Sequence, residues 1–147
     1  MNELFNNQYI ELTTYYKVEK NKSGVVNLVV ITEKEFNTAK LNEKLKDSVK
    51  SLRTKWKVPN WKTGNDIYQM SSFWNPQKND MDVNWNKYRD LRFKQSLVDW
   101  DAKTESGDTI PCNSETIDML SENMAVAILK QFDEATRPSK EDEEKNS

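Results

Sequence analysis

Hydrophobic and polar residues alternate in the first part of the chain. From residue 9 to residue 18, one set of alternating positions is largely apolar: Ile10, Leu12, Tyr16 and Val18. A period of two is typical of a strand with one buried face. A turn sequence at residues 21–24 precedes the β-branched run Val25–Ile31, so a β-hairpin is predicted. A lone hairpin is only marginally stable in water, and this one is expected to pack on another element.

The period changes after the hairpin. Thr32 and Glu35 have the spacing of a capping box, which marks the start of a helix. The apolar residues that follow lie three to five positions apart: Phe36, Leu41, Leu45, Val49, Leu52 and Trp56. Such a stripe is typical of an amphipathic helix, and a proline ends one. The spacing therefore predicts a single long helix from Glu33 to shortly before Pro59.

Further helices are predicted along the rest of the chain. They run from Thr63 to Trp74, from Asp82 towards Trp100, from Ser114 through Leu120, and from Ser121 to Arg137. The predicted fold class is therefore α+β and predominantly helical, with an N-terminal β-hairpin followed by four or five packed helices. Residues 1–137 are expected to form a single domain. Residues 138–147 are almost all polar and are expected to form a disordered tail.

The helix predicted to end near Trp100 has apolar residues on two sides. One stripe holds Trp85, Phe93, Leu97 and Trp100, and the other holds Tyr88, Leu91 and Val98. A single neighbouring element does not cover both sides, so either a second helix of the protein or a partner protein covers the other one. Trp and Tyr are favoured anchors of protein interfaces. The predicted partner-binding residues are Trp85, Tyr88, Leu91, Val98 and Trp100.

Composition restricts the chemistry that the chain can perform. It contains no histidine and a single cysteine, Cys112, which excludes the usual general base, cysteine-cluster zinc sites and internal disulfides. Its three glycines are isolated and form no phosphate-binding loop. The acidic segment from Asp99 to Asp108 has the wrong spacing for a calcium loop in either register. We therefore expect no catalytic residue, no cofactor and no metal site.

A basic stretch runs from Lys44 to Lys62 and contains Trp56 and Trp61. Basic and aromatic side chains together can grip single-stranded nucleic acid. The alternative is that the lysines form the solvated side of a helix whose other side is apolar. Acidic residues within the stretch and a net charge of −2 for the whole chain favour this alternative.

No apolar run approaches the roughly 18 residues of a membrane-spanning helix. The first residues lack a charged segment followed by an apolar one, which a secretory signal would have. The sequence therefore predicts a protein that stays in the cytoplasm where it is made.

One resemblance to a known family rests on the second half of the chain. The residues that carry it are Trp85-Asn86-Lys87-Tyr88-Arg89-Asp90-Leu91-Arg92, Leu97-Val98-Asp99-Trp100-Asp101, Gly107, Ile110-Pro111, Ile117, Leu120 and Ala125-Val126-Ala127-Ile128-Leu129. This arrangement resembles the C-terminal half of tail assembly chaperones from long-tailed bacteriophages. Those proteins share a helix ending in Trp-Asp, a loop with Gly and Pro, and a closing helix rich in Ala, Ile and Leu. The match covers residues 85–135.

The resemblance implies a role in virion assembly. A protein of this family binds the long tape measure protein in the host cytoplasm, recruits tail tube subunits to it, and is absent from the finished virion. Two other functions stay open: a structural protein of the virion, such as a head–tail or tail component, which belongs to the area that the resemblance implies, and a small nucleic-acid-binding protein that uses the stretch from Lys44 to Lys62.

Overall fold

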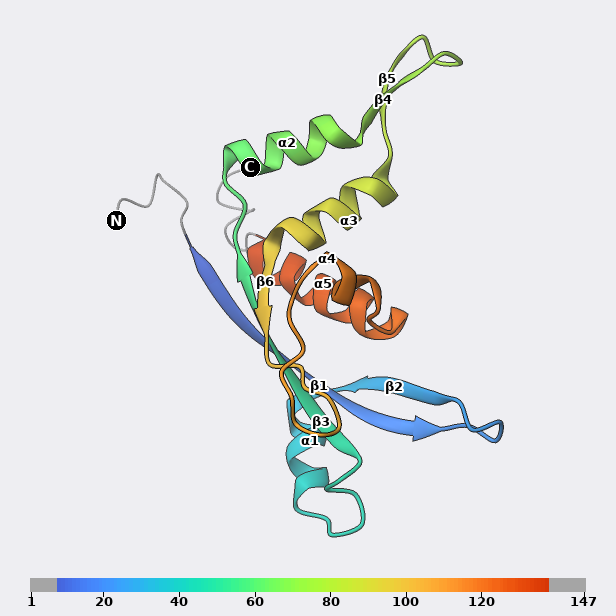
Figure 1. Cartoon of the computed structure of the whole chain (residues 1–147), viewed down its shortest axis with the longest axis vertical. Helices are drawn as coiled ribbons and strands as arrows, with labels where there is room; N and C mark the ends of the chain where they lie inside the picture. The colour runs from blue at the N-terminus through green and yellow to red at the C-terminus, as the bar shows by residue number, and fades with distance from the viewer. Residues whose placement is uncertain (1–7, 138–147) are drawn as a thin grey trace, which may run out of the picture. The chain divides into compact units, whose positions relative to one another are not determined.

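The computed structural model describes residues 8–137, and it contains helices and strands in similar proportion (Figure 1). Helices make up 39% and strands 32% of the described residues, so the prediction of a predominantly helical fold is wrong. In chain order the elements are β1 (Tyr9–Lys20), β2 (Val26–Ile31), α1 (Glu33–Lys40), β3 (Val49–Lys57), α2 (Trp61–Ser71), β4 (Ser72–Asn75), β5 (Asp80–Val83), α3 (Trp85–Ser96), β6 (Leu97–Trp100), α4 (Ser114–Asp118) and α5 (Glu122–Thr136).

Four of these strands form an antiparallel sheet in the order β2-β1-β3-β6, and β4 and β5 form a separate two-stranded sheet. The described chain divides into two compact units. The first consists of residues 8–11 and 53–119, and the second of residues 12–52 and 120–137. Two of the three divisions fall inside β1 and β3, so each of these strands contributes residues to both units, and the third falls between α4 and α5.

The largest departure from prediction is β3, which replaces the second half of the expected long helix. Helix α1 ends at Lys40, and Leu41 and Leu45 of the predicted stripe are 90% and 48% exposed. In β3 the side chains alternate instead, with Leu52, Thr54 and Trp56 buried and the residues between them exposed. Apolar residues at these positions satisfy both a helical and a two-residue period. Pairing with a strand on each side selects the extended form.

In the second unit the predicted β-hairpin and the predicted final helix are confirmed. Strands β1 and β2 pair from Tyr15 with Ile31 to Lys20 with Val26. The Thr32 side chain caps α1 by accepting a hydrogen bond from the Glu35 amide at 3.1 Å, and the rings of Tyr15 and Phe36 are 4.7 Å apart. Helix α5 begins after its cap Ser121 and buries four apolar side chains: Met124, Ile128, Leu129 and Phe132.

In the first unit the core gathers around Trp56, whose side chain is fully buried. Its ring is 5.6 Å from that of Phe93 in α3, and its indole nitrogen donates a 2.7 Å hydrogen bond to the Thr54 hydroxyl. Other buried apolar residues of this unit are Ile67, Leu97, Trp100 and Ile117. Each large ring removes on the order of 150–250 Å² from water, so few aliphatic residues are needed.

The helices predicted on either side of residue 75 are both shorter than expected. Helix α2 ends at Ser71, and the next residue, Ser72, has an extended backbone (φ −85°, ψ 146°). Helix α3 starts after Asn84, whose side chain caps it by accepting a 3.1 Å hydrogen bond from the Lys87 amide. Helix α3 ends at Ser96, where Leu97 turns into β6 and pairs with Trp56 of β3. The predicted tail, residues 138–147, lies outside the described residues. Within residues 8–137, no helix combines the length and apolar character needed to cross a membrane.

Candidate protein-binding surface

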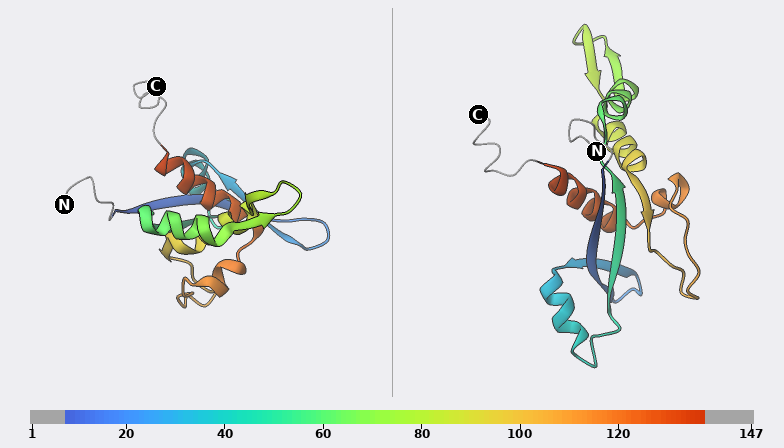
Figure 2. Two further views of the ribbon diagram at one scale, coloured as in Figure 1. Left: turned by 90° about the horizontal axis from the view of Figure 1, so that it is seen from above. Right: turned by 90° about the vertical axis from the view of Figure 1, so that its left-hand side faces the viewer.

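Residues Ser72–Val83 form a hairpin that extends from the ends of α2 and α3, and we call this hairpin the arm (Figures 1 and 2). Its base is closed by a 2.8 Å hydrogen bond from the Asn84 amide to the Ser71 carbonyl. An isolated two-stranded hairpin is marginally stable in water. The stability of the arm therefore depends on the side-chain interactions on its two faces.

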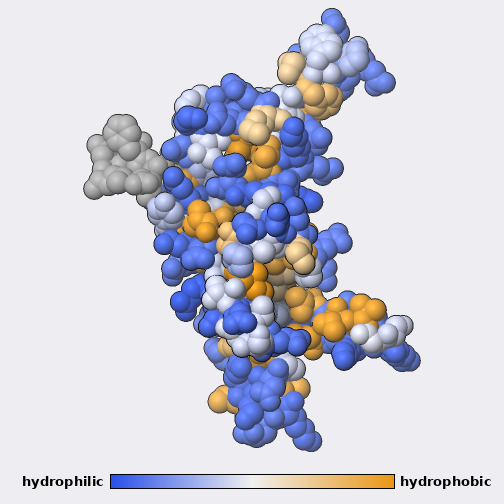
Figure 3. All heavy atoms as spheres, viewed as in Figure 1, coloured by the Kyte–Doolittle hydropathy of each residue, from blue (hydrophilic) through white to orange (hydrophobic). Residues whose placement is uncertain are grey.

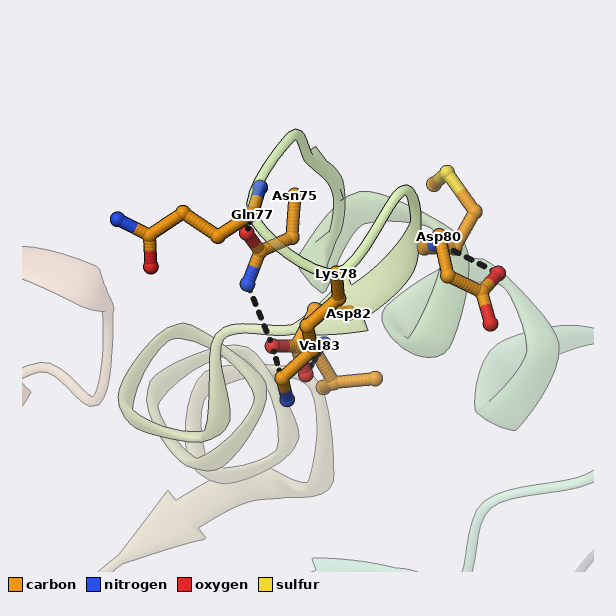
Figure 4. Close-up of polar contacts among 7 residues, drawn as sticks. Asn75, Gln77, Lys78, Asp80, Asp82 and Val83 are labelled. Carbon is orange, nitrogen blue, oxygen red and sulfur yellow. Dashed lines mark hydrogen bonds and ion pairs between the residues drawn. The ribbon is translucent and has the colours of Figure 1, made fainter.

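One face of the arm is held by a polar network centred on Asp82 (Figure 4). The Asp82 carboxylate accepts hydrogen bonds from Lys78 Nζ at 3.0 Å, Asn75 Nδ2 at 3.2 Å and the Val83 amide at 2.9 Å. These donors, the Lys78 bond foremost, lower the pKa of Asp82 below its ordinary value. In the turn, the Gln77 amide donates to the Asn75 side chain at 3.0 Å. The network thus links β4, the turn and β5 through side chains, in addition to the backbone pairing of the two strands.

The opposite face of the arm is apolar and exposed. Trp74 of β4 lies directly across from Met81 of β5, and both side chains are more than half exposed, at 55% and 57%. Residues directly opposite in an antiparallel pair have their side chains on the same face. The next cross-strand pair on this face is Ser72 with Val83. An exposed Trp–Met pair on a projecting hairpin is unusual for a soluble monomer, and such apolar surface is commonly covered by another molecule.

Further large apolar side chains are exposed next to the arm. Met70 at the end of α2 is 54% exposed, Phe73 in β4 is 45% exposed and Trp85 at the start of α3 is 64% exposed. Phe73 pairs with Asp82 and lies on the polar face, so we call Met70, Trp74, Met81 and Trp85 together the arm patch. Figure 3 shows apolar atoms on the arm among hydrophilic ones. Trp85 also makes an edge-on contact with Tyr88, with ring centroids 5.4 Å apart.

The five residues predicted from sequence as a partner-binding surface do not share one surface. Trp85 is exposed at the start of α3, and Tyr88 and Leu91 are half-buried along the same helix. Val98 lies in β6 and is 39% exposed. Trp100 is only 7% exposed and its indole nitrogen donates to the Ile110 carbonyl at 2.7 Å. Trp100 is therefore a core residue and not an exposed one, because the change from helix to strand at Leu97 turns its side chain into the core.

Sequence reasoning missed the arm residues. It placed Trp74 inside a helix and used Asn75-Pro76 only as the end of that helix. The signal was a pair of short segments, Ser72–Asn75 and Asp80–Val83, around a turn with Pro76 and Asn79. Asn79 adopts a positive φ of 52°, a conformation that Asn tolerates better than most residues. Such a loop typically contains Pro and Asn, and here Pro76 and Asn79 lie between the aromatic residues of β4 and the apolar residues of β5.

The acidic segment after Asp99 is a loop that is anchored to β3 and closed at its tip by its own hydrogen bonds. Asp101 extends the sheet by accepting from the Arg53 amide at 2.8 Å through its side chain and donating to the Arg53 carbonyl at 3.1 Å. Thr104 and Asp108 close the tip through their backbone groups at 2.8 Å. Within residues 8–137, no three acidic or cysteine side chains are grouped as metal ligands. Burial, and secondarily Asp99, raises the pKa of the Cys112 thiol to about 11, which makes it a poor nucleophile at neutral pH.

The basic stretch is distributed over several elements. Arg53, Lys55 and Lys57 share the outer side of β3, and Lys55 Nζ lies 5.2 Å from the centre of the Tyr9 ring. Lys46 pairs with Glu43 at 3.0 Å and Lys62 pairs with Asp66 at 2.8 Å. Asp99 is directly opposite Lys55 across β3 and β6. Neighbouring carboxylates thus offset much of the positive charge that a nucleic-acid surface needs.

Comparison with known proteins adds no relative: no protein-family model, no curated protein and no solved structure matches this chain.

Proposed function

We propose that this chain is a non-catalytic protein-binding chaperone and that the arm patch is its contact surface. The observation that carries the proposal is the Trp74–Met81 pair, exposed on a hairpin that extends from the rest of its unit. Contiguous exposed apolar surface is uncommon on soluble monomers and marks interaction sites. Trp is the residue most often found at the energetic centre of such sites, and flexible Met adapts to irregular apolar partners.

The proposed partner comes from the resemblance of residues 85–135 to tail assembly chaperones. It is a tape measure protein, which the chain would bind in the host cytoplasm while tail tube subunits are recruited. A long helical partner that is prone to aggregate presents apolar stripes, and an exposed aromatic hairpin provides a complementary surface. The arm patch and the resemblance support the proposal independently, because only Trp85 belongs to both.

The test is co-expression of the chain with a tape measure protein, with the soluble fraction of the partner as the readout. We expect the wild-type chain to keep the partner soluble and the Trp74→Ser/Met81→Ser variant to lose most of this effect. Trp61→Ser is the matched control, because Trp61 is 85% exposed but lies at the start of α2, outside the arm patch. Circular dichroism melts of each variant establish that the fold is intact.

Two results would contradict the proposal. If Trp61→Ser lowers partner solubility as much as the double variant does, the arm patch is not the specific surface. If the wild-type chain fails to solubilise the partner and is found in purified virions, a structural role in the virion replaces the chaperone role. Binding to single-stranded nucleic acid with an affinity that falls steeply with salt would favour the basic stretch instead.

A further inference from the structure

Strand β2 is a terminal strand of the four-stranded sheet, and its sequence lacks the charged residues and the proline that usually protect such an edge. From Val25 to Ile31 the chain has no charged residue and no proline. Natural edge strands commonly carry lysine, proline or a bulge, which prevent pairing with another chain. This segment is instead rich in β-branched residues, the composition that pairs most readily.

The hydrogen-bonding direction along β2 follows from its register. The Asn21 amide donates to the Val25 carbonyl at 2.9 Å, and the ladder continues with Tyr15 opposite Ile31. In this antiparallel pairing the odd-numbered residues of β2 bond to β1, so the amide and carbonyl groups of the even-numbered residues point outward. In agreement with this direction, the Leu28 carbonyl accepts a 3.4 Å hydrogen bond from the Asn123 side chain of α5, and strand pairing at Leu28 would replace this long hydrogen bond.

Exposed valines also flank this edge on the two faces of β2. Val26 and Val30, on one face, are 52% and 45% exposed, Val25, on the other face, is 54% exposed, and Figure 3 shows apolar residues gathered along β2. Outward-pointing backbone groups and exposed valines therefore occur together along β2. A strand added at this edge would form hydrogen bonds with the backbone groups and cover part of the valine side chains.

We infer that the added strand is β2 of a second copy of this chain, paired antiparallel across a twofold axis. The strand is self-complementary, because an axis at Leu28 places Val26 of each copy opposite Val30 of the other in the outward register. The charges flanking the strand agree with this orientation. Lys20 and Lys22 lie at the β1–β2 turn, and Glu33 and Glu35, with Lys34 between them, follow β2. Antiparallel pairing brings the basic end of each copy to the acidic end of the other.

The dimer is expected to be weak and reversible. A pair of six-residue strands buries less than the roughly 1,200 Å² of a standard stable interface. Sedimentation velocity of the full chain, from low to high micromolar concentration, should therefore show a monomer converting to a dimer. In Val30→Lys, the lysine of each copy faces Val26 of the other within the exposed apolar row, and the dissociation constant should rise about tenfold or more.

The matched control is Val98→Lys, which introduces the same charge at a similarly exposed valine in β6, the strand at the other end of the sheet. It should leave the dimer unchanged, and a melting curve shows whether each variant is folded. Should Val30→Lys fail to fold, Val26→Lys tests the same contact. The register is tested by Val26→Cys/Val30→Cys in a Cys112→Ser background, which should give a dimer linked by disulfides under mild oxidation.

Three outcomes would overturn the inference: a monomer at every concentration, a dimer that Val30→Lys leaves intact, or a dimer that Val98→Lys abolishes. A monomer whose Val30→Lys variant loses partner binding would instead assign β2 to a strand of that partner. The Trp74→Ser/Met81→Ser variant should still form the dimer. Failure of the arm patch as a binding surface is thereby distinguished from failure of β2 pairing.

Discussion

The Thr14 hydroxyl donates a 2.8 Å hydrogen bond to the side-chain carbonyl of Gln131, a residue 117 positions later in the chain. The same Gln131 side chain donates its amide to the Thr13 carbonyl at 2.9 Å. Thr14 is only 4% exposed, so its hydroxyl has little access to water as a substitute partner. One side chain of α5 thus satisfies a buried hydroxyl and a backbone carbonyl of β1.

Gln131→Ala should therefore destabilise the fold by about 1–3 kcal/mol, because it leaves buried polar groups of β1 without their partner. Urea unfolding followed by circular dichroism measures the change. Lys130→Ala, at the exposed neighbouring position of the same helix, should change the stability by no more than about 0.5 kcal/mol. An equal loss in both variants would indicate that helix propensity, and not the Gln131 contacts, sets the effect.

Leu52 and Leu45 belonged to one predicted helical stripe, and the structure separates them. Leu52 is 7% exposed in β3, whereas Leu45 is 48% exposed in the segment before that strand. Leu52→Asp should unfold the protein, because burying an unpaired charge costs several kcal/mol. Leu45→Asp should leave a cooperative thermal transition close to that of the wild type. If both variants unfold, the long helix and not β3 describes residues 45–56.

Ser96 is fully buried at the end of α3, and within the described chain its hydroxyl has no hydrogen-bond partner. Ser96→Ala removes this unsatisfied group and should stabilise the protein by about 1 kcal/mol. Ser71→Ala is the matched control, because the equally buried Ser71 hydroxyl donates to the Ile67 carbonyl at 2.7 Å. That variant should be neutral or slightly destabilised in urea unfolding. A loss of stability in Ser96→Ala would show that the hydroxyl has a partner, such as a bound water.

The half-buried Cys112 thiol makes stability depend on pH in the alkaline range. Its pKa is raised from 9.0 to about 11 in the folded state, so the fold favours the neutral thiol. The resulting stabilisation is present below pH 9 and is lost as the pH rises towards 11, because the unfolded chain then releases the proton first. We expect the stability of Cys112→Ser to fall less steeply than that of the wild type over this interval. Identical slopes in urea titrations at several pH values would contradict the shift.

The pKa also predicts reactivity. At pH 8 the native thiol should react with iodoacetamide much more slowly than the same thiol in the urea-unfolded chain, because the thiolate is the reacting species. The rate ratio is measured by mass spectrometry on a single residue, since the chain has one cysteine. Equal rates in the two states would place the Cys112 thiol in open solvent.

The sequence alone determined the elements that depend on interactions between residues close together in the chain. The hairpin of β1 and β2 follows from the alternation of residues 9–18 and the turn with Gly24, where a positive φ of 83° suits a residue without a side chain. The start of α1 follows from Thr32 and the start of α5 from Ser121, because a cap bonds to amides only three residues away.

The tertiary structure decided whether a segment whose apolar spacing fits both a helix and a strand forms the helix or the strand. Leu52 and Trp56 are four positions apart and also two strand repeats apart, and the neighbouring strands β1 and β6 supply the hydrogen bonds that make the extended form favourable. The sequence neighbours of Trp100 suggest a surface anchor, but its side chain is buried and its indole nitrogen donates to the Ile110 carbonyl, which lies across a loop. The exposure of Trp74 likewise depends on its pairing with Met81 and on what lies beyond that face. Burial is a property of contacts between distant residues, and a local pattern of apolar positions specifies a face without specifying what covers it.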